Sequence, residues 1–277
     1  MPASRDPRQL EVDDRPRNSS HPSPPLHRLA LLGRAATPYL SAGVLVTSAT
    51  CELWLYRLSA LLRGQSAHRG VRALQHWSRR SWRWLCLDVR VHGAPSNTPR
   101  IYVSNHRSYL DIPVLSGVLG ASFISRADVA TWPLIGAAAK AVGTVFVNRE
   151  DPYARAHAAR RLMRHVGKLS VVVFAEGTTT RERFPGPFHR GFFELACRLK
   201  TAIVPVTIRY SHRRAYWTDD ITLPHHLLTR ILTMPPLIVR VHIGRHIESR
   251  DFGDGETVAR AVHEAVCEPI AEFGELA

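Results

Sequence analysis

The segment Ser104–Asp111 carries a histidine and a carboxylate, His106 and Asp111, between two short apolar runs. Such runs on either side of a polar loop are typical of a strand, a loop and the start of a helix. Histidine can accept a proton near neutral pH, and a carboxylate at its second ring nitrogen fixes the tautomer and stabilises the imidazolium. The pair therefore indicates general-base chemistry.

The spacing of His106 and Asp111 limits how they can meet. Five positions correspond to about 140° around a continuous helix, so only a turn into the helix start can bring the two side chains together. In the alternative interpretation, Ser108 and Asp111 form a capping pair for the following helix and His106 is an ordinary loop residue.

Arg149 ends a second candidate segment, which starts at Gly143 and contains the apolar run Val145–Val147. An arginine at the end of a strand can bind a phosphate through two parallel hydrogen bonds. The alternative is a surface arginine that pairs with Glu150 or Asp151.

Glu176, Gly177 and Thr178 follow the apolar run Leu169–Phe174 in a third candidate segment. A glycine followed by hydroxyl residues offers free backbone N–H groups and short donors, which suit an anion. Glu176 could accept hydrogen bonds from an arginine or hold the loop. The alternative is an ordinary turn with a threonine N-cap.

Apolar runs alternate with helix-like segments after residue 88, which predicts an α/β fold. The strand-like runs are Val89–His92, Ile101–Ser104, Ala121–Ser125, Thr144–Val147, Ser170–Phe174, Ala202–Ile208 and Leu237–Ile243. The helix-like segments are Ile112–Leu119, Pro133–Val142, Tyr153–Val166, Gly191–Leu199 and Glu256–Glu272. We expect a single domain with a sheet of roughly seven strands, mixed in direction and flanked by helices. Pro205 predicts a local irregularity, such as an edge or a bulge.

The N-terminal part has a different character. Residues 1–25 are polar and rich in proline, which predicts a disordered tail. Residues 26–87 predict a membrane-associated helix pair. The first helix, Leu26–Leu62, is apolar and could span the bilayer, lie in one leaflet or pack as a buried helix. The second, residues 66–87, places tryptophans opposite a face of arginines, which suits an anionic membrane surface or, alternatively, a helix packed on its own domain with a solvated basic face.

The formal net charge of +14 indicates an anionic partner. The arginines of residues 66–87 lie opposite an apolar stripe and no nucleic-acid-binding motif is present, so we expect an anionic membrane surface and no nucleic acid. The four cysteines form no close pair, which argues against a zinc ribbon or a disulfide framework, and we expect no metal site.

Taken together, the motifs resemble the four ordered sequence blocks of the glycerolipid acyltransferase family, which includes bacterial 1-acyl-sn-glycerol-3-phosphate (lysophosphatidic acid) acyltransferases. Asn105-His106 with Asp111 resembles the first block, and Gly143 to Arg149 the second. Glu176-Gly177-Thr178 resembles the third block, and Val204-Pro205-Val206 the fourth. The resemblance covers roughly residues 66–245 and identifies residues 88–277 as the catalytic domain.

The resemblance implies that His106 is the general base, oriented by Asp111, and that acyl-CoA or acyl-acyl carrier protein is the donor, with no cofactor. It implies that Arg149 and the loop Glu176-Gly177-Thr178 bind the polar head of the acceptor, and Arg126 could contribute charge. The enzyme would lie at the inner membrane with its active site on the cytoplasmic face.

Two residues depart from the family pattern. The third block has Ala175 before the glutamate and Thr179 after the threonine, where the family often has proline and arginine. The missing arginine removes one expected phosphate ligand. We expect 1-acyl-sn-glycerol-3-phosphate as the acceptor, with another lyso-lipid such as lyso-ornithine lipid as the alternative. A non-catalytic basic protein that binds membranes or nucleic acid is the alternative of another class.

Overall fold

The computed structural model describes residues 25–148, 151, 153, 160–162, 164–218, 220–233 and 235–272, and their side chains from residue 37 onward. The chain divides into two compact units, residues 1–36 and 37–277. Helix α1 (Pro25–Arg63) provides the described part of the first unit and continues into the second. Residues 1–24 of the predicted tail, Arg149 and half of the predicted helix 153–166 lie outside the described residues.

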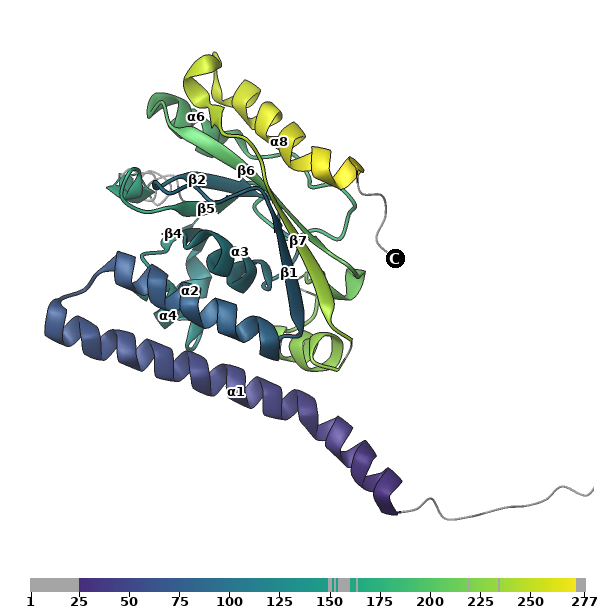
Figure 1. Ribbon diagram of the computed structural model, residues 1–277. Coiled ribbons are helices and arrows are strands. Elements are labelled where there is room, and N and C mark those ends of the chain that lie inside the picture. The colour runs from purple at the N-terminus through teal and green to yellow at the C-terminus, as the bar shows by residue number, and fades with distance from the viewer. Residues whose placement is uncertain are drawn as a thin grey trace, which may run out of the picture. The chain divides into compact units, whose positions relative to one another are not determined.

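A mixed eight-stranded sheet forms the centre of the second unit, which confirms the predicted α/β fold (Figure 1). The strands are β1 (Leu87–His92), β2 (Ile101–Ser104), β3 (Ser122–Arg126), β4 (Val145–Val147), β5 (Val171–Phe174), β6 (Ala202–Tyr210), β7 (Leu237–Ile243) and β8 (Ile247–Glu248). Their order is β1-β7-β6-β2-β5-β3-β4, with β8 beside β6. β6 runs antiparallel to β7 and β8, and the other pairs are parallel.

Pro205 lies inside β6, where the pairing on one side is interrupted. β8 pairs with the start of β6 as far as Ile203, and β7 pairs with it from Val206 onward. Between these pairs, the N–H of Gly244 donates to the Pro205 carbonyl at 2.9 Å. Proline has no N–H for a ladder, so it fits the point at which β6 changes partners. This is the local irregularity that the sequence predicts.

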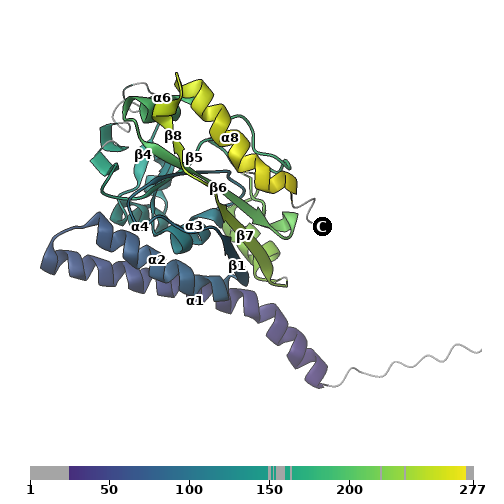
Figure 2. The ribbon, with the colours of Figure 1, turned by 45° about the horizontal axis from the view of Figure 1, so that its top comes forward.

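Helices cover both faces of the sheet. Figures 1 and 2 show α2 (Ala67–Trp84) and α3 (Asp111–Leu119) on one face, and α6 (Arg190–Arg198) and α8 (Gly255–Glu272) on the other. Alternate residues of each strand face opposite sides, so Tyr102 joins the core under α3, whereas Val103 joins the core under α8. The carboxyl end of β2 emerges between these two cores.

The remaining described elements are shorter. They are η1 (Ala127–Thr131), α4 (Ile135–Ala141), η2 (Arg213–Ala215), α7 (Leu223–His226), a π-helical turn η3 (Leu227–Ile231) and η4 (Ser249–Asp251). The insertion 211–236, which carries no clear pattern in the sequence, therefore contains three short helical segments between β6 and β7.

Two of the three tryptophans of α2 are packed within the protein, and the third, Trp84, is 45% exposed. Trp82 donates from Nε1 to the Pro113 carbonyl at 3.1 Å, and Trp77 donates to the Ser48 hydroxyl of α1 at 3.2 Å. α2 is therefore packed on its own domain through these two side chains, as in the alternative interpretation of its sequence. Among the described residues, none of the helices combines the length and apolar character needed to cross a membrane.

Candidate active site

The loop after β2 is anchored by Asn105, which is fully buried. Its side-chain Nδ2 donates to the Ile208 carbonyl of β6 at 3.0 Å, and the Ile208 N–H donates to Oδ1 at 2.8 Å. One side chain thus supplies both halves of a backbone-like pairing, which satisfies the buried polar groups of the neighbouring strand. This contact fixes the point at which the loop leaves the sheet.

His106 and Asp111 meet in the turn that follows. Nδ1 of His106 lies 2.7 Å from Oδ2 of Asp111, whose side chain is 0% exposed. The same oxygen accepts the backbone N–H groups of Arg107 at 2.7 Å and Ser108 at 3.0 Å. An ionised carboxylate can only accept hydrogen bonds, so Nδ1 donates and Nε2 is left to accept a proton. Asp111 therefore both caps the turn and binds the histidine.

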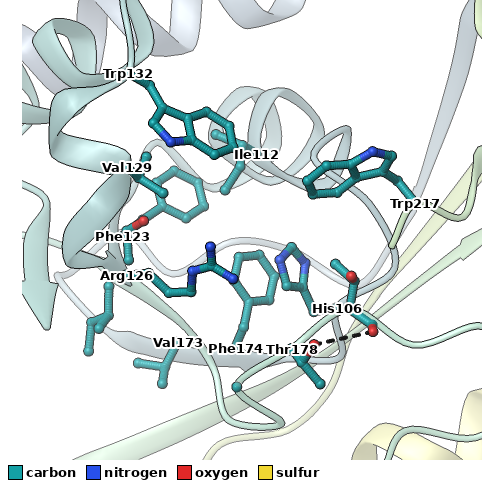
Figure 3. Close-up of a pocket in the computed structure, with 14 residues that line it drawn as sticks. His106, Ile112, Phe123, Arg126, Val129, Trp132, Val173, Phe174, Thr178 and Trp217 are labelled. Atoms are coloured by element: carbon teal, nitrogen blue, oxygen red, sulfur yellow. Dashed lines mark hydrogen bonds between the residues drawn. The ribbon is translucent and has the colours of Figure 1, made fainter. Parts of the chain in front are cut away.

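The imidazole of His106 stacks on Phe174, with ring centroids 3.9 Å apart and 14° between the planes. It forms part of the wall of a pocket of about 160 Å³ (Figure 3). Most of the wall is apolar and comes from Ile112, Phe123, Ile124, Val129, Trp132, Val173, Phe174 and Trp217. The pocket can hold an apolar group next to a base that is ready to accept a proton.

Glu176 lies behind this wall and is buried. Its Oε1 accepts the His106 N–H at 2.8 Å and its Oε2 accepts the Gly186 N–H at 3.0 Å. Burial raises the pKa of the carboxyl group above its usual value, and the two backbone hydrogen bonds oppose this shift. The sequence allows Glu176 either to accept hydrogen bonds from an arginine or to hold the loop in place. Because both of its oxygens accept backbone N–H groups, the geometry matches the second role.

Gly177 and Thr178 do line the pocket. Gly177 has φ of +80° and its N–H donates to the Phe174 carbonyl at 3.1 Å. Side chains other than glycine rarely adopt this backbone conformation, so the glycine allows the chain to turn immediately after β5. The turn places the exposed Thr178 at the pocket rim, where the sequence predicts a ligand for the acceptor's polar head.

Arg126, at the end of β3, is a charged residue of the pocket wall, and its side chain extends into the pocket in Figure 3. Its guanidinium group donates to both oxygens of Asp128, at 3.0 and 2.8 Å. These hydrogen bonds hold the pKa of Asp128 below its usual value. Arg126 of the pocket wall is therefore paired with an acidic side chain, Asp128, that is not itself part of the wall. Arg149, the other predicted arginine, lies outside the described residues.

Arg107 is 2% exposed and holds the loop that follows Thr179 of the pocket wall. Its guanidinium group donates to the carbonyls of Thr180, Glu182 and Arg183 and to the Thr180 hydroxyl, at 2.6–3.3 Å. Its own carbonyl accepts the Trp217 N–H at 2.9 Å. One buried arginine therefore connects the histidine loop, the loop 180–183 and the insertion 211–236.

Sequence reasoning assigned no role to Arg107, Tyr210 or Trp217. In a chain with many arginines, nothing marks Arg107 as a buried one. Tyr210 comes after the apolar run Ala202–Ile208, and its hydroxyl donates to Asp111 Oδ1 at 2.6 Å. Trp217 lies in the insertion. Within the described part of the chain, no three histidine, cysteine or acidic side chains are grouped as metal ligands.

Comparisons with known proteins agree with this geometry. The family model described as acyltransferase matches residues 88–209. The lyso-ornithine lipid O-acyltransferase of Pseudomonas aeruginosa is 32% identical over 213 residues, which are 74% of this chain and 80% of that protein. The 1-acyl-sn-glycerol-3-phosphate acyltransferase of Neisseria gonorrhoeae is 27% identical over 249 residues, 82% of this chain and 94% of that protein.

The fold has a counterpart of known structure. The crystal structure of the 1-acyl-sn-glycerophosphate acyltransferase from Thermotoga maritima aligns with a TM-score of 0.64 at 22% identity, over 89% of this chain and 97% of that one. At this identity the match establishes a shared fold, and the sequence relatives establish the family. The chain belongs to the acyltransferase family and is an O-acyltransferase, not a non-catalytic basic binding protein.

Proposed function

We propose that the protein transfers a fatty acyl group from an acyl thioester, acyl-CoA or acyl-acyl carrier protein, to the hydroxyl group of a lyso-lipid. The observation that supports this function best is the hydrogen bond between His106 Nδ1 and the buried Asp111 carboxylate, beside an apolar pocket. It combines a proton acceptor with space for a lipid chain.

In the proposed reaction, Nε2 of His106 takes the proton from the acceptor hydroxyl as its oxygen attacks the thioester carbonyl. Asp111 stabilises the imidazolium that forms and keeps Nδ1 protonated. When the tetrahedral intermediate collapses, the C–S bond breaks and the imidazolium returns the proton to the departing thiolate. The products are an ester and a free thiol, and no acyl-enzyme is formed.

Replacing His106 tests the base. His106→Ala should lower acyl transfer by about 100- to 10,000-fold, because this is what general-base catalysis typically contributes. His246→Ala, at an exposed histidine after β7, is the matched control and should leave the rate unchanged. Acyl transfer is measured with radiolabelled donor and purified protein. A His106→Ala variant with the activity of the parent would rule out the proposed base.

For the acceptor, Arg126 and Asp128 favour a head group with both charges. Their paired side chains can bind a carboxylate and an ammonium group respectively. The free ornithine carboxylate and amine of lyso-ornithine lipid match this pair. A phosphate would meet the repulsion of Asp128, and the arginine often found after Thr178 is absent. We therefore place lyso-ornithine lipid first and 1-acyl-sn-glycerol-3-phosphate, the acceptor expected from the sequence, second.

Asp128→Asn distinguishes the two acceptors because it should change KM in opposite directions for them. With lyso-ornithine lipid, losing the carboxylate should raise KM by about 2- to 5-fold, in the range of exposed charge pairs. With 1-acyl-sn-glycerol-3-phosphate, the same change should lower KM, because a repulsive charge is removed. Asp88→Asn, at an exposed aspartate on β1, is the control. A lower KM with the phosphate lipid, together with no effect on lyso-ornithine lipid, would reverse the order.

We further propose that α1 holds the enzyme on the cytoplasmic face of an anionic membrane. Five large apolar side chains are exposed along the second half of this helix, at one-turn spacing: Trp54, Leu55, Leu58, Leu61 and Leu62. Four arginines of α2 are also exposed: Arg72, Arg79, Arg80 and Arg83. An apolar stripe with basic residues nearby is typical of helices that lie in the headgroup region.

A further inference from the structure

The carboxylate of Asp111 has a partner that the proposed proton transfer leaves without a role. The hydroxyl of Tyr210, the last residue of β6, lies 2.6 Å from Asp111 Oδ1. Both residues are 0% exposed. Because an ionised carboxylate only accepts, the phenol must donate this bond. A hydrogen bond from a neutral phenol to a buried carboxylate is short and strong.

The two oxygens of Asp111 are satisfied in different ways. Oδ2 accepts from His106 Nδ1 and from two backbone N–H groups of the turn. Among the described residues, Oδ1 accepts from Tyr210. Without the phenol, this buried oxygen would lose its donor, which makes the charged form of the carboxylate less stable. The Tyr210 hydroxyl therefore acts on the same charge that orients His106.

Tyr210 itself is held firmly and stays protonated. Its backbone is paired with Val239 of β7, and its ring meets Tyr216 edge to face, with centroids 6.5 Å apart. Burial, followed by the charge of Asp111, raises the pKa of the phenol well above its usual value. Tyr210 is not part of the pocket wall. It can therefore influence the reaction only through Asp111.

We propose that Tyr210 is a positioning residue for proton transfer, whose hydroxyl fixes the Asp111 carboxylate with Oδ2 toward His106 and takes up part of its charge. The proposal rests on the proposed role of His106 as the base. The active pair contains a neutral imidazole and an ionised carboxylate. Losing a donor to the carboxylate makes the pair hold a proton more tightly, so the active form is reached only at higher pH.

Other titratable and charged groups surround the His106–Asp111 pair, and a substitution of Tyr210 leaves all of them in place. They are Arg107 and Tyr109 from its own loop, Glu176 after β5, Tyr216 after η2 and Arg126 across the pocket. None of them donates to Asp111 Oδ1 in the described structure. A shift that appears when only the Tyr210 hydroxyl is removed can therefore be assigned to that hydrogen bond.

Tyr210→Phe removes the hydroxyl and keeps the ring. The acid side of the kcat profile should move to higher pH by about one unit, the size expected for one hydrogen bond to a charged group. At pH values below the acid limb, kcat should fall roughly 10-fold relative to the parent protein. At pH values above the limb, most of this kcat should be recovered, and KM should stay within about 2-fold throughout. Tyr102→Phe is the matched control, since Tyr102 is equally buried and its hydroxyl accepts the Ser96 N–H at 3.1 Å. Its profile should not move.

A second variant covers the case in which Tyr210→Phe fails to fold. Site-specific 3-fluorotyrosine at position 210 keeps the shape and makes the phenol a stronger donor, so the acid limb should move to lower pH. A uniform loss of rate across pH, or limbs that do not move in either variant, would overturn the positioning role.

Nuclear magnetic resonance of the His106 imidazole separates this proposal from the proposed function. Its titration midpoint, identified with the His106→Ala variant, should rise in Tyr210→Phe whether or not a substrate is turned over. If the parent protein transfers no acyl group but the midpoint still moves, the proposed function fails and the contact stands. If acyl transfer depends on His106 and the midpoint is unchanged, the positioning role fails alone.

Discussion

Asp111 combines a structural and a chemical task in one side chain. Its Oδ2 accepts the N–H groups of Arg107 and Ser108, as a capping residue does, and also accepts from His106. The sequence suggested a Ser108–Asp111 capping pair with an uninvolved His106 as the alternative; in the structure Asp111 accepts from the Ser108 N–H of the turn and also from His106. The geometry explains why a spacing of five works: the turn, and not a helical face, brings the two side chains together.

Asp111→Asn tests the chemical task separately from the structural one. An amide keeps the shape and an acceptor oxygen for the turn, but it carries no charge to stabilise an imidazolium. We expect kcat to fall by about 1,000- to 10,000-fold, as in other histidine–carboxylate pairs, with little change in thermal unfolding. Asp88→Asn serves as the control for the same substitution at an exposed site. Near-normal kcat in Asp111→Asn would contradict the role of the carboxylate.

At the scale of elements, α2 and α3 pack closely at one glycine. A Cβ atom built on Gly117 of α3 would lie 2.4 Å from the Trp82 ring of α2. Arg79 also donates to the Gly117 carbonyl at 2.7 Å. Since α3 begins at Asp111, this contact between helices also fixes the element that carries the carboxylate of the proposed proton-transfer pair.

Gly117→Ala should therefore destabilise the protein although alanine favours helices. Overpacking of this kind typically lowers the free energy of unfolding by about 1–3 kcal/mol. Gly191→Ala in α6 is the matched control, because a Cβ there meets nothing within 4 Å and should stabilise by about 0.4–1 kcal/mol. Chemical denaturation measures both. Equal effects of the two substitutions would show that the contact with Trp82 is unimportant.

Elements with a strong apolar pattern could be predicted from the sequence, and the rest could not. β2 and β7 have the bounds that their apolar runs predict: β2 is buried throughout, and β7 alternates between buried and half-buried residues, as a strand with one covered face does. β6 extends two residues further, because Arg209 and Tyr210 pair with β7 although their side chains are polar. The eighth strand, β8, has two residues and leaves no pattern.

The candidate site was predictable to a similar extent. Residue type and spacing made His106 and Asp111 candidates, and the order of the family blocks selected them, together with Gly177 and Thr178 in the pocket wall. Tyr210 and Arg107 act through contacts with segments distant in the sequence, and such contacts are set by the tertiary fold. The role of Glu176 depends on which backbone groups reach its oxygens, which residue type alone cannot reveal.

At the scale of the whole molecule, the exposed apolar side chains of α1 and the exposed arginines of α2 are the surface on which the proposed membrane contact depends. Leu61 and Leu62 are 83% and 79% exposed. Burying such side chains contributes roughly 1.5–3 kcal/mol each, and each arginine near an anionic surface contributes about 1 kcal/mol. Binding should therefore combine an apolar part with a part that weakens as salt is added.

A double variant, Leu58→Glu with Leu61→Glu, tests this surface. We expect binding to vesicles that contain anionic lipid to weaken by at least about 100-fold, since the apolar contribution of two side chains is lost. Sedimentation with vesicles measures it. Val91→Glu, at an exposed apolar residue of β1, is the control. Unchanged sedimentation of the double variant would show that α1 does not contact the bilayer.

The strand order has a consequence for the time at which activity appears. Asn105 binds Ile208 of β6, which lies 103 positions further along the chain. Asp111 accepts its hydrogen bond from Tyr210 of the same strand, β6. A ribosome that has released only the first two hundred residues or so has therefore exposed the histidine without its supports, since contacts of such long range form late. We therefore expect the nascent polypeptide to transfer no acyl group until β6 has been synthesised and has paired with β2.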